Sequence, residues 1–120
     1  MQLFTKEQQA RLMKNGQTPG ADHRPVVKLF TPDAACTWLL TEIDPDQPGI
    51  AFGLCDLGLG YPELGPVSLE ELKRLREKLN LPVERDRHFE ARYSLSVYAR
   101  AADARQAITE DAEALARAAA

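Results

Sequence analysis

The sequence contains no apolar run that approaches the roughly 20 residues needed to cross a bilayer. Residues 1–7 also lack the basic start and apolar stretch of a secretory signal. We therefore expect a cytoplasmic protein that does not enter a membrane. There are only two cysteines, Cys36 and Cys55. In a reducing compartment we predict that they remain buried thiols and form no disulfide.

Motifs for metal and nucleotide binding are also missing. The histidines and cysteines stand alone in the sequence, with neither Cys-x-x-Cys nor His-x-x-x-His spacing; they are His23, Cys36, Cys55 and His88. Gly58 and Gly60 invite comparison with a dinucleotide fingerprint, but Glu63 takes the place of the third glycine. We expect no metal and no cofactor. We interpret this segment as a tight loop that needs glycines of positive φ.

Residues 31–72 contain no lysine or arginine. The same stretch carries eight acidic residues: Asp33, Glu42, Asp44, Asp46, Asp56, Glu63, Glu70 and Glu71. By contrast, residues 1–30 carry five basic and two acidic side chains, and residues 73–120 carry ten basic and eight acidic ones. Such an asymmetry bears on partners rather than on fold. We expect a partner with a basic surface.

The chain has enough apolar residues for one core, at 44% of 120 residues. Its patterns predict an α+β fold, with a small, mainly antiparallel β-sheet and three to four helices packed on it. We divide it into an N-terminal helix and loop (1–25), an α+β core domain (26–103) and an alanine-rich C-terminal helical tail (104–120). The tail has little to bury, so we expect it to fray.

Four apolar segments bounded by turn formers predict strands. They cover residues 26–30, 37–43, 50–57 and 63–67. In the second, Leu39, Thr41 and Ile43 are predicted to share one face. The turn-rich residues 44–49 predict an antiparallel hairpin. Pro66 confines the last strand to an edge or a bulge. Residues 83–89 suit only an exposed edge strand or a loop.

Capping residues predict where the helices begin. Thr5 and Gln8 form a capping box that predicts a helix over residues 6–15, and Gly16 is predicted to take the left-handed exit position. A second capping box begins at Ser68 and predicts a helix that ends shortly after Asn80. A third helix is predicted to begin after Ser94 or Ser96.

The acidic block supplies the candidate binding residues. Carboxylates presented on a rigid sheet imitate the phosphate charges of a nucleic acid and so fit the basic groove of a DNA-binding protein. The residues we select for this role are Asp44, Asp46, Asp56 and Glu63. The hypothesis requires these carboxylates to gather on one solvent-facing surface.

Two alternatives remain open. A small hydrolase would use Asp56 and Glu63 as its paired carboxyls, one with a raised pKa. Direct nucleic-acid binding would use Arg85, Arg87 and Arg92. The second alternative is disfavoured because acidic residues interleave with these arginines, whereas nucleic-acid-binding domains are usually net basic. A cysteine nucleophile is disfavoured as well, because both thiols lie in apolar segments.

Six segments carry a resemblance to a known family: VKLFTP (27–32), TWLLTE (37–42), GLCDLGLG (53–60), PELG (62–65), SLEEL (68–72) and LPVERD (81–86). Together they resemble an uncharacterised bacterial family, domain of unknown function 2958. The resemblance implies a gene carried on mobile genetic elements such as plasmids. Small proteins of such elements often inhibit restriction or CRISPR systems. The resemblance therefore implies a non-enzymatic protein of the anti-CRISPR or antirestriction type, and it implies no catalytic residues.

Overall fold

The sheet has five antiparallel strands in the order β4-β3-β2-β1-β5. Their bounds are β1 Val27–Phe30, β2 Thr37–Asp44, β3 Gln47–Asp56, β4 Glu63–Ser68 and β5 Glu84–Arg85. The computed structural model describes residues 3–79 and 81–120, with side chains outside residues 76–79. The predicted α+β class is confirmed. Pro66 lies on the edge strand β4, opposite Phe52, where a proline is tolerated.

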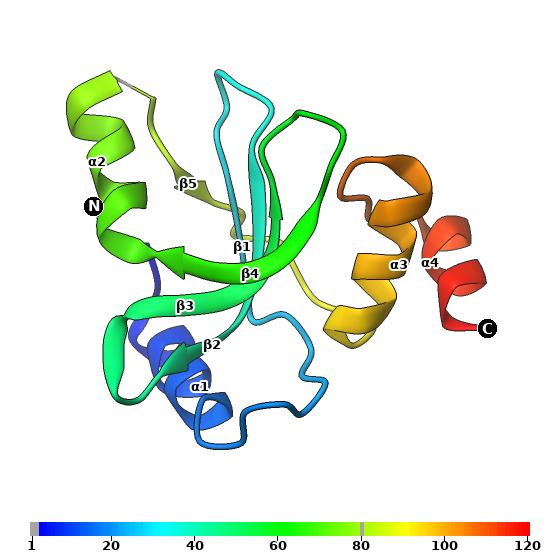
Figure 1. The fold of residues 1–120 in the computed structure, drawn as a ribbon, viewed down its shortest axis with the longest axis horizontal. Coiled ribbons are helices and arrows are strands. Elements are labelled where there is room, and N and C mark those ends of the chain that lie inside the picture. Colours follow the sequence, from blue (N-terminus) through cyan, green and yellow to red (C-terminus); the bar gives the residue numbers. More distant parts are fainter. Residues whose placement is uncertain (1–2, 80) are drawn as a thin grey trace.

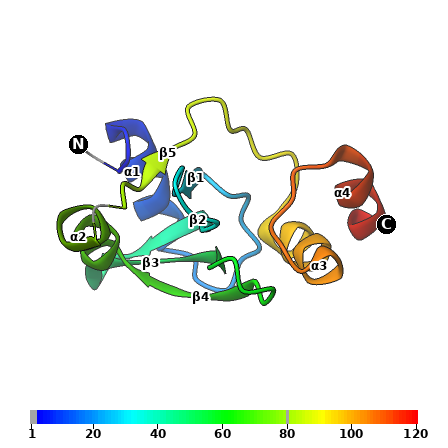
Figure 2. The same cartoon turned by 90° about the horizontal axis from the view of Figure 1, so that it is seen from above.

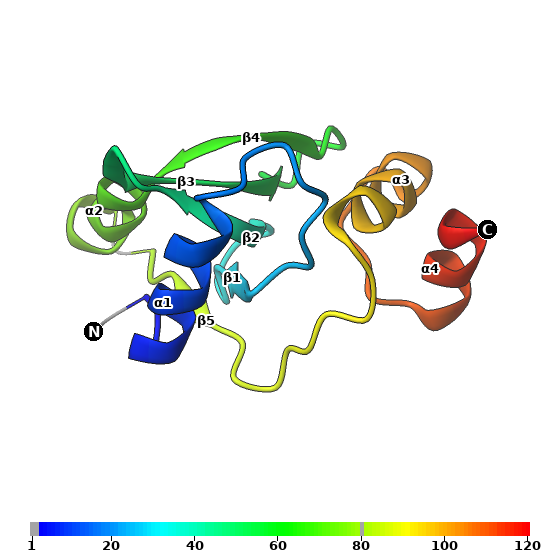
Figure 3. The same ribbon diagram turned by 90° about the horizontal axis from the view of Figure 1, so that it is seen from below.

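Four helices pack on this sheet (Figure 1): α1 Lys6–Asn15, α2 Leu69–Leu79, α3 Leu95–Arg105 and α4 Ala112–Ala119. The helices α1 and α2 lie on one side of the molecule, and α3 and α4 lie together on the other (Figures 1 and 3). A long loop leads from β5 to α3 and carries the chain from the first side to the second (Figure 2). The predicted end of α2 near Asn80 lies outside the described residues.

The first helix begins as its sequence predicts. Thr5 accepts a hydrogen bond from the Gln8 backbone N–H, and the Gln8 side chain accepts one from the Thr5 backbone N–H. Gly16 caps the other end, but the predicted left-handed conformation is wrong, since its φ is −64°. The glycine is needed there for space. A Cβ atom would lie 1.9 Å from the Ile43 carbonyl oxygen, so only glycine lets the end of α1 approach β2 this closely.

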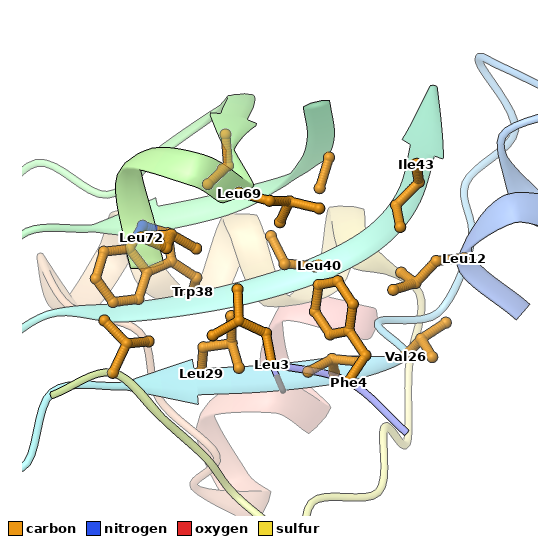
Figure 4. Close-up of a cluster of buried hydrophobic side chains, with 14 residues drawn as sticks. Leu3, Phe4, Leu12, Val26, Leu29, Trp38, Leu40, Ile43, Leu69 and Leu72 are labelled. Atoms are coloured by element: carbon orange, nitrogen blue, oxygen red, sulfur yellow. The ribbon is translucent and has the colours of Figure 1, made fainter. Parts of the chain in front are cut away.

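The larger core lies between the sheet and the helices α1 and α2 (Figure 4). Leu12 of α1 and Leu72 of α2 meet Leu40, which projects from the central strand β2. Trp38 and the N-terminal Phe4 pack into the same cluster. Because Leu12 and Leu40 have no exposed surface, the centre of this face is closed to solvent.

A bulge corrects one predicted face of β2. The register between β2 and β3 shifts between Leu40 and Glu42. The extra residue reverses the alternation of side chains beyond it. Ile43 therefore joins Trp38 and Leu40 in the larger core, and does not share a face with Leu39 as predicted. The hairpin turn is also tighter than predicted, because β3 begins at Gln47.

A smaller core lies on the opposite face of the sheet. Leu39 and Leu54 of the sheet pack there against Tyr98 and Ala102 of α3. The predicted fraying of the tail is wrong, because α4 packs on α3 and buries Leu115 completely. The α4 N-cap Asp111 accepts a hydrogen bond from the Ala114 backbone N–H, which also stabilises this short helix.

An ion-pair network ties the α3–α4 connection to the sheet. Lys28 of β1 lies 2.6 Å from Glu110 and 3.5 Å from Asp86. Burial acts to lower the pKa of Lys28, but the two carboxylates outweigh it and hold the pKa above its ordinary value. The lysine therefore stays charged and engages both acids.

Candidate functional site

Asp44 and Asp46 lie at the turn between β2 and β3. Both side chains are exposed. The Asp46 backbone N–H donates a 2.9 Å hydrogen bond to the Asp44 carboxylate, which fixes the turn. The Asp46 carboxylate extends from this rigid turn into solvent. These two acids thus stand where the sequence predicts, at the tip of a hairpin.

Asp56 does not belong to an exposed surface, which corrects the predicted site. Its exposed fraction is 5%. One carboxylate oxygen accepts a 2.9 Å hydrogen bond from the Gly58 backbone N–H, and the other accepts one of the same length from Ile108. Asp56 therefore joins the end of β3 to the segment between α3 and α4. Its role is structural, because both oxygens are engaged by the protein's own backbone.

Glu63 is exposed but lies far from the hairpin turn. It begins β4 and pairs with Cys55, near the end of β3. The turn with Asp46 precedes the other end of β3. This strand is ten residues long, which corresponds to about 30 Å at the usual rise. The four predicted acids therefore do not gather on one surface.

The structure instead forms a groove beside Asp44 and Asp46, on the face of the sheet that α3 only partly covers. Its volume is about 840 Å³, which is within the range of ligand and peptide sites. Apolar side chains of β3 and β4 line it, namely Ile50, Phe52, Leu64 and Pro66. The loop before β1 forms one wall, and the first residues of α3 close one end.

Four carboxylates border this groove, and we call it the acid-rimmed groove. They are Asp22, Glu42, Asp44 and Asp46. None of the described residues that line it is a lysine, arginine or histidine. Because low-dielectric walls focus the field of like charges, the groove attracts cations.

Asp22 also holds one wall of the groove in place. Its carboxylate accepts hydrogen bonds from the Ser96 hydroxyl and, at 3.0 Å, from the Ser96 backbone N–H. The Ser96 hydroxyl holds the pKa of Asp22 below its ordinary value, although burial opposes this. The α3 N-cap Ser94 makes no side-chain capping bond. Asp22 therefore caps α3 from a distant loop.

The exposed large apolar side chains all come from one hairpin, formed by β3, β4 and their connecting loop. Among the described residues they are Phe52, Leu57, Leu59, Tyr61 and Leu64. Leu59 and Tyr61, in the loop, are 73% and 77% exposed. The predicted tight loop is confirmed, since Gly58 and Gly60 both adopt positive φ.

The predicted basic residues do not form one site. Arg85 is half-buried on β5, opposite Leu29, and Arg87 is exposed in the loop that follows. Arg92 donates a 2.8 Å hydrogen bond to the Glu110 carbonyl. It lines a pocket with Arg11 and Arg24, which neither Arg85 nor Arg87 lines.

The remaining chemical candidates gain no support from the geometry. A hydrolase needs accessible carboxyls, but Asp56 is buried and neither it nor Glu63 lines the acid-rimmed groove. Burial, with a smaller contribution from the Glu63 charge, raises the pKa of the Cys55 thiol and so disfavours a nucleophilic thiolate. The described residues contain no group of three or more metal ligands. Nor do they contain a helix both long and apolar enough to span a membrane.

Comparison with known proteins places the chain in one family. The family described as "Protein of unknown function (DUF2958)" matches residues 3–109. The chain belongs to the DUF2958 family. The match covers the whole sheet and the helices α1, α2 and α3, whereas α4 lies beyond it. No curated protein and no solved structure matches this DUF2958 protein significantly.

Sequence reasoning missed Asp22, Glu42 and the apolar floor of the groove. One signal was present. Ile50 and Phe52 alternate with buried residues on β3, and both faces of the sheet are apolar. That pattern requires a cover on each face. The extent of the cover depends on where α3 packs, which periodicity does not specify.

Proposed function

We propose that this protein is a non-enzymatic interaction module that binds a host protein with a basic surface through the acid-rimmed groove. The proposal rests on one observation. An apolar floor that includes Phe52 and Leu64 is bordered by four carboxylates and by no basic side chain among the described residues. Apolar area supplies affinity, whereas charge of one sign supplies steering and selectivity.

The groove suits a partner helix better than a partner strand. An amphipathic helix would lay its apolar face on Phe52 and Leu64 and present lysines or arginines to the rim. Adding a strand to β4 is less favourable, because the edge strand is only six residues long and contains Pro66. Proline has no N–H to donate and is one of the residues that blunt sheet edges.

Nucleic-acid-binding proteins are the partner class that fits best. Their basic surfaces are built to accept phosphate charges, and carboxylates on a rigid scaffold compete for the same surface. A protein of a mobile genetic element would use such binding to inhibit a CRISPR or restriction nuclease, and would thus be of the anti-CRISPR or antirestriction type. Asp44 and Asp46 keep the role predicted for them, together with Asp22 and Glu42. Asp56 and Glu63 are not part of the proposed surface.

A quantitative pull-down from bacterial lysate tests the proposal. We compare the natural protein with D44N/D46N, which removes two carboxylates but keeps the oxygen that accepts the Asp46 backbone bond. E7Q/E113Q is the matched control, because it removes two exposed carboxylates outside the groove. We expect to recover a basic nucleic-acid-binding partner, and its recovery should fall about tenfold with D44N/D46N. The fall is expected at low salt, because about 1 M salt screens the attraction between the carboxylates and the basic partner.

A second variant tests the apolar floor. F52S/L64S removes two side chains that are already exposed, so folding should be preserved. It should reduce recovery of the same partner at both low and high salt. Equal recovery with the natural protein, D44N/D46N and F52S/L64S, or the absence of any basic partner, would refute the proposed function.

A further inference from the structure

A second pocket lies between α1, the loop before β1 and the loop from β5 to α3. It has a volume of about 470 Å³ and shares no lining residue with the acid-rimmed groove. Three arginines from these three segments line it, namely Arg11, Arg24 and Arg92. We call it the arginine pocket. Three chain segments far apart in sequence thus converge with the same charge.

The described residues that line this pocket carry more positive than negative charge. Glu90 is the only carboxylate among the described residues that line it. None of the three arginines makes an ion pair with a residue that the structure describes. Asp86 and Glu110 are not among the described residues that line the pocket, and both pair with Lys28. Three guanidinium groups against one carboxylate leave a net charge of about +2, because arginine is charged at all relevant pH values.

The pocket is also partly preorganised. The Arg92 side chain is held by the Glu110 carbonyl, and its backbone N–H donates a 3.1 Å hydrogen bond to the Tyr98 hydroxyl. The half-buried ring of Phe89 forms one wall and packs against Tyr98, with ring centroids 6.3 Å apart. A ligand would therefore find Arg92 and an aromatic wall already in position, which lowers the entropic cost of binding.

We propose that the arginine pocket binds a phosphate group that is not part of a diester, either as a monoester such as a nucleotide or as free phosphate. A monoester carries a charge between −1.5 and −2 near pH 7, which matches the net charge of the pocket. The planar guanidinium group binds phosphate oxygens through two parallel hydrogen bonds. A phosphodiester carries only one charge, so nucleic acid matches the pocket less well. The site is independent of the proposed partner groove.

Isothermal titration at low ionic strength tests this proposal with three probes: inorganic phosphate, adenosine monophosphate and a single-stranded oligonucleotide without terminal phosphates. We expect the first two to bind with one site per chain. Tighter binding of adenosine monophosphate than of phosphate would identify the nucleotide as the source of the group, with Phe89 contacting the base. Equal binding of the two would identify free phosphate. Binding of the oligonucleotide alone would overturn the monoester assignment.

R11Q/R24Q is the informative variant. Both side chains are exposed, and neither makes a hydrogen bond to a residue that the structure describes. Its binding of phosphate should weaken about tenfold or more, as expected for the loss of charged hydrogen bonds. The matched control K73Q/R117Q removes two exposed positive charges outside the pocket. Equal weakening in both variants would reveal nonspecific charge attraction and overturn the site. Undetectable binding of all three probes by the natural protein would overturn it too.

Discussion

The two faces of the sheet are covered to different extents. On one face, α1, α2 and the N-terminal segment close over Leu40 and Ile43, which have no exposed surface. On the other, α3 covers Leu39 and Leu54 but stops short of Phe52 and Leu64, which are 37% and 50% exposed. The first face is built for stability. The second leaves apolar area whose burial requires another molecule, and this is the area that the carboxylates border.

The largest expected difference between the faces is in the cost of removing a leucine. Leu40→Ala should lower the free energy of unfolding by about 3 kcal/mol, because a cavity forms in a packed core. Leu64→Ala should change it by less than about 0.5 kcal/mol, because half of that side chain already contacts water. Urea denaturation followed by circular dichroism measures both. Similar losses in the two variants would mean that the second face is as closed as the first.

A buried carboxylate gives the next largest effect. Asp56→Ala removes the acceptor of two backbone hydrogen bonds and should cost about 2 kcal/mol. It should also speed proteolysis between α3 and α4, since Ile108 loses its anchor to the sheet. Glu63→Ala is the control, because the Glu63 side chain is exposed. If Asp56→Ala unfolds at the same urea concentration as Glu63→Ala, the Asp56 hydrogen bonds contribute nothing to holding the helices of the second face on the sheet.

Local signals predicted most of the fold. The capping box at Thr5 and the turn formers after Asp44 act within a few residues, so the sequence specifies them directly. The predictions that failed depend on distant contacts. Gly16 is shaped by the carbonyl of Ile43, and Leu115 is buried only because α4 folds back on α3. The bulge in β2 likewise depends on pairing with β3, and it places Ile43 on the opposite face from the one predicted.

The candidate site was only partly predictable for a related reason. The net charge along the chain identified an acidic block. Asp56 was grouped with the exposed acids because it is near them in the sequence, but its carboxylate is buried. Asp22 was overlooked because it lies in a mildly basic segment and reaches the groove only through its bonds to Ser96. A charge pattern thus predicts the sign of a surface, whereas the fold decides which charges contribute to it.

The smallest expected effect concerns Asp22, which holds in place the loop that forms one wall of the acid-rimmed groove. Because its pKa is lowered in the folded protein, Asp22 stabilises the fold above the ordinary aspartate pKa, and this contribution is lost as the pH falls through the lowered value.

Asp22→Asn should therefore be less stable than the natural protein by about 0.5–1 kcal/mol at pH 7, a modest cost because solvent screens an exposed cap. The difference should shrink as the pH falls below the ordinary aspartate pKa and through the lowered value. Comparing the two proteins cancels the titration of all other acids, and Asp103→Asn, an exposed change elsewhere in α3, is the control. A deficit in Asp22→Asn that stays constant as the pH is lowered through this range would mean that the neutral carboxyl holds the α3 N-terminus equally well. In that case the negative charge of Asp22 would contribute to binding the partner but not to the stability of the loop and helix that shape the groove.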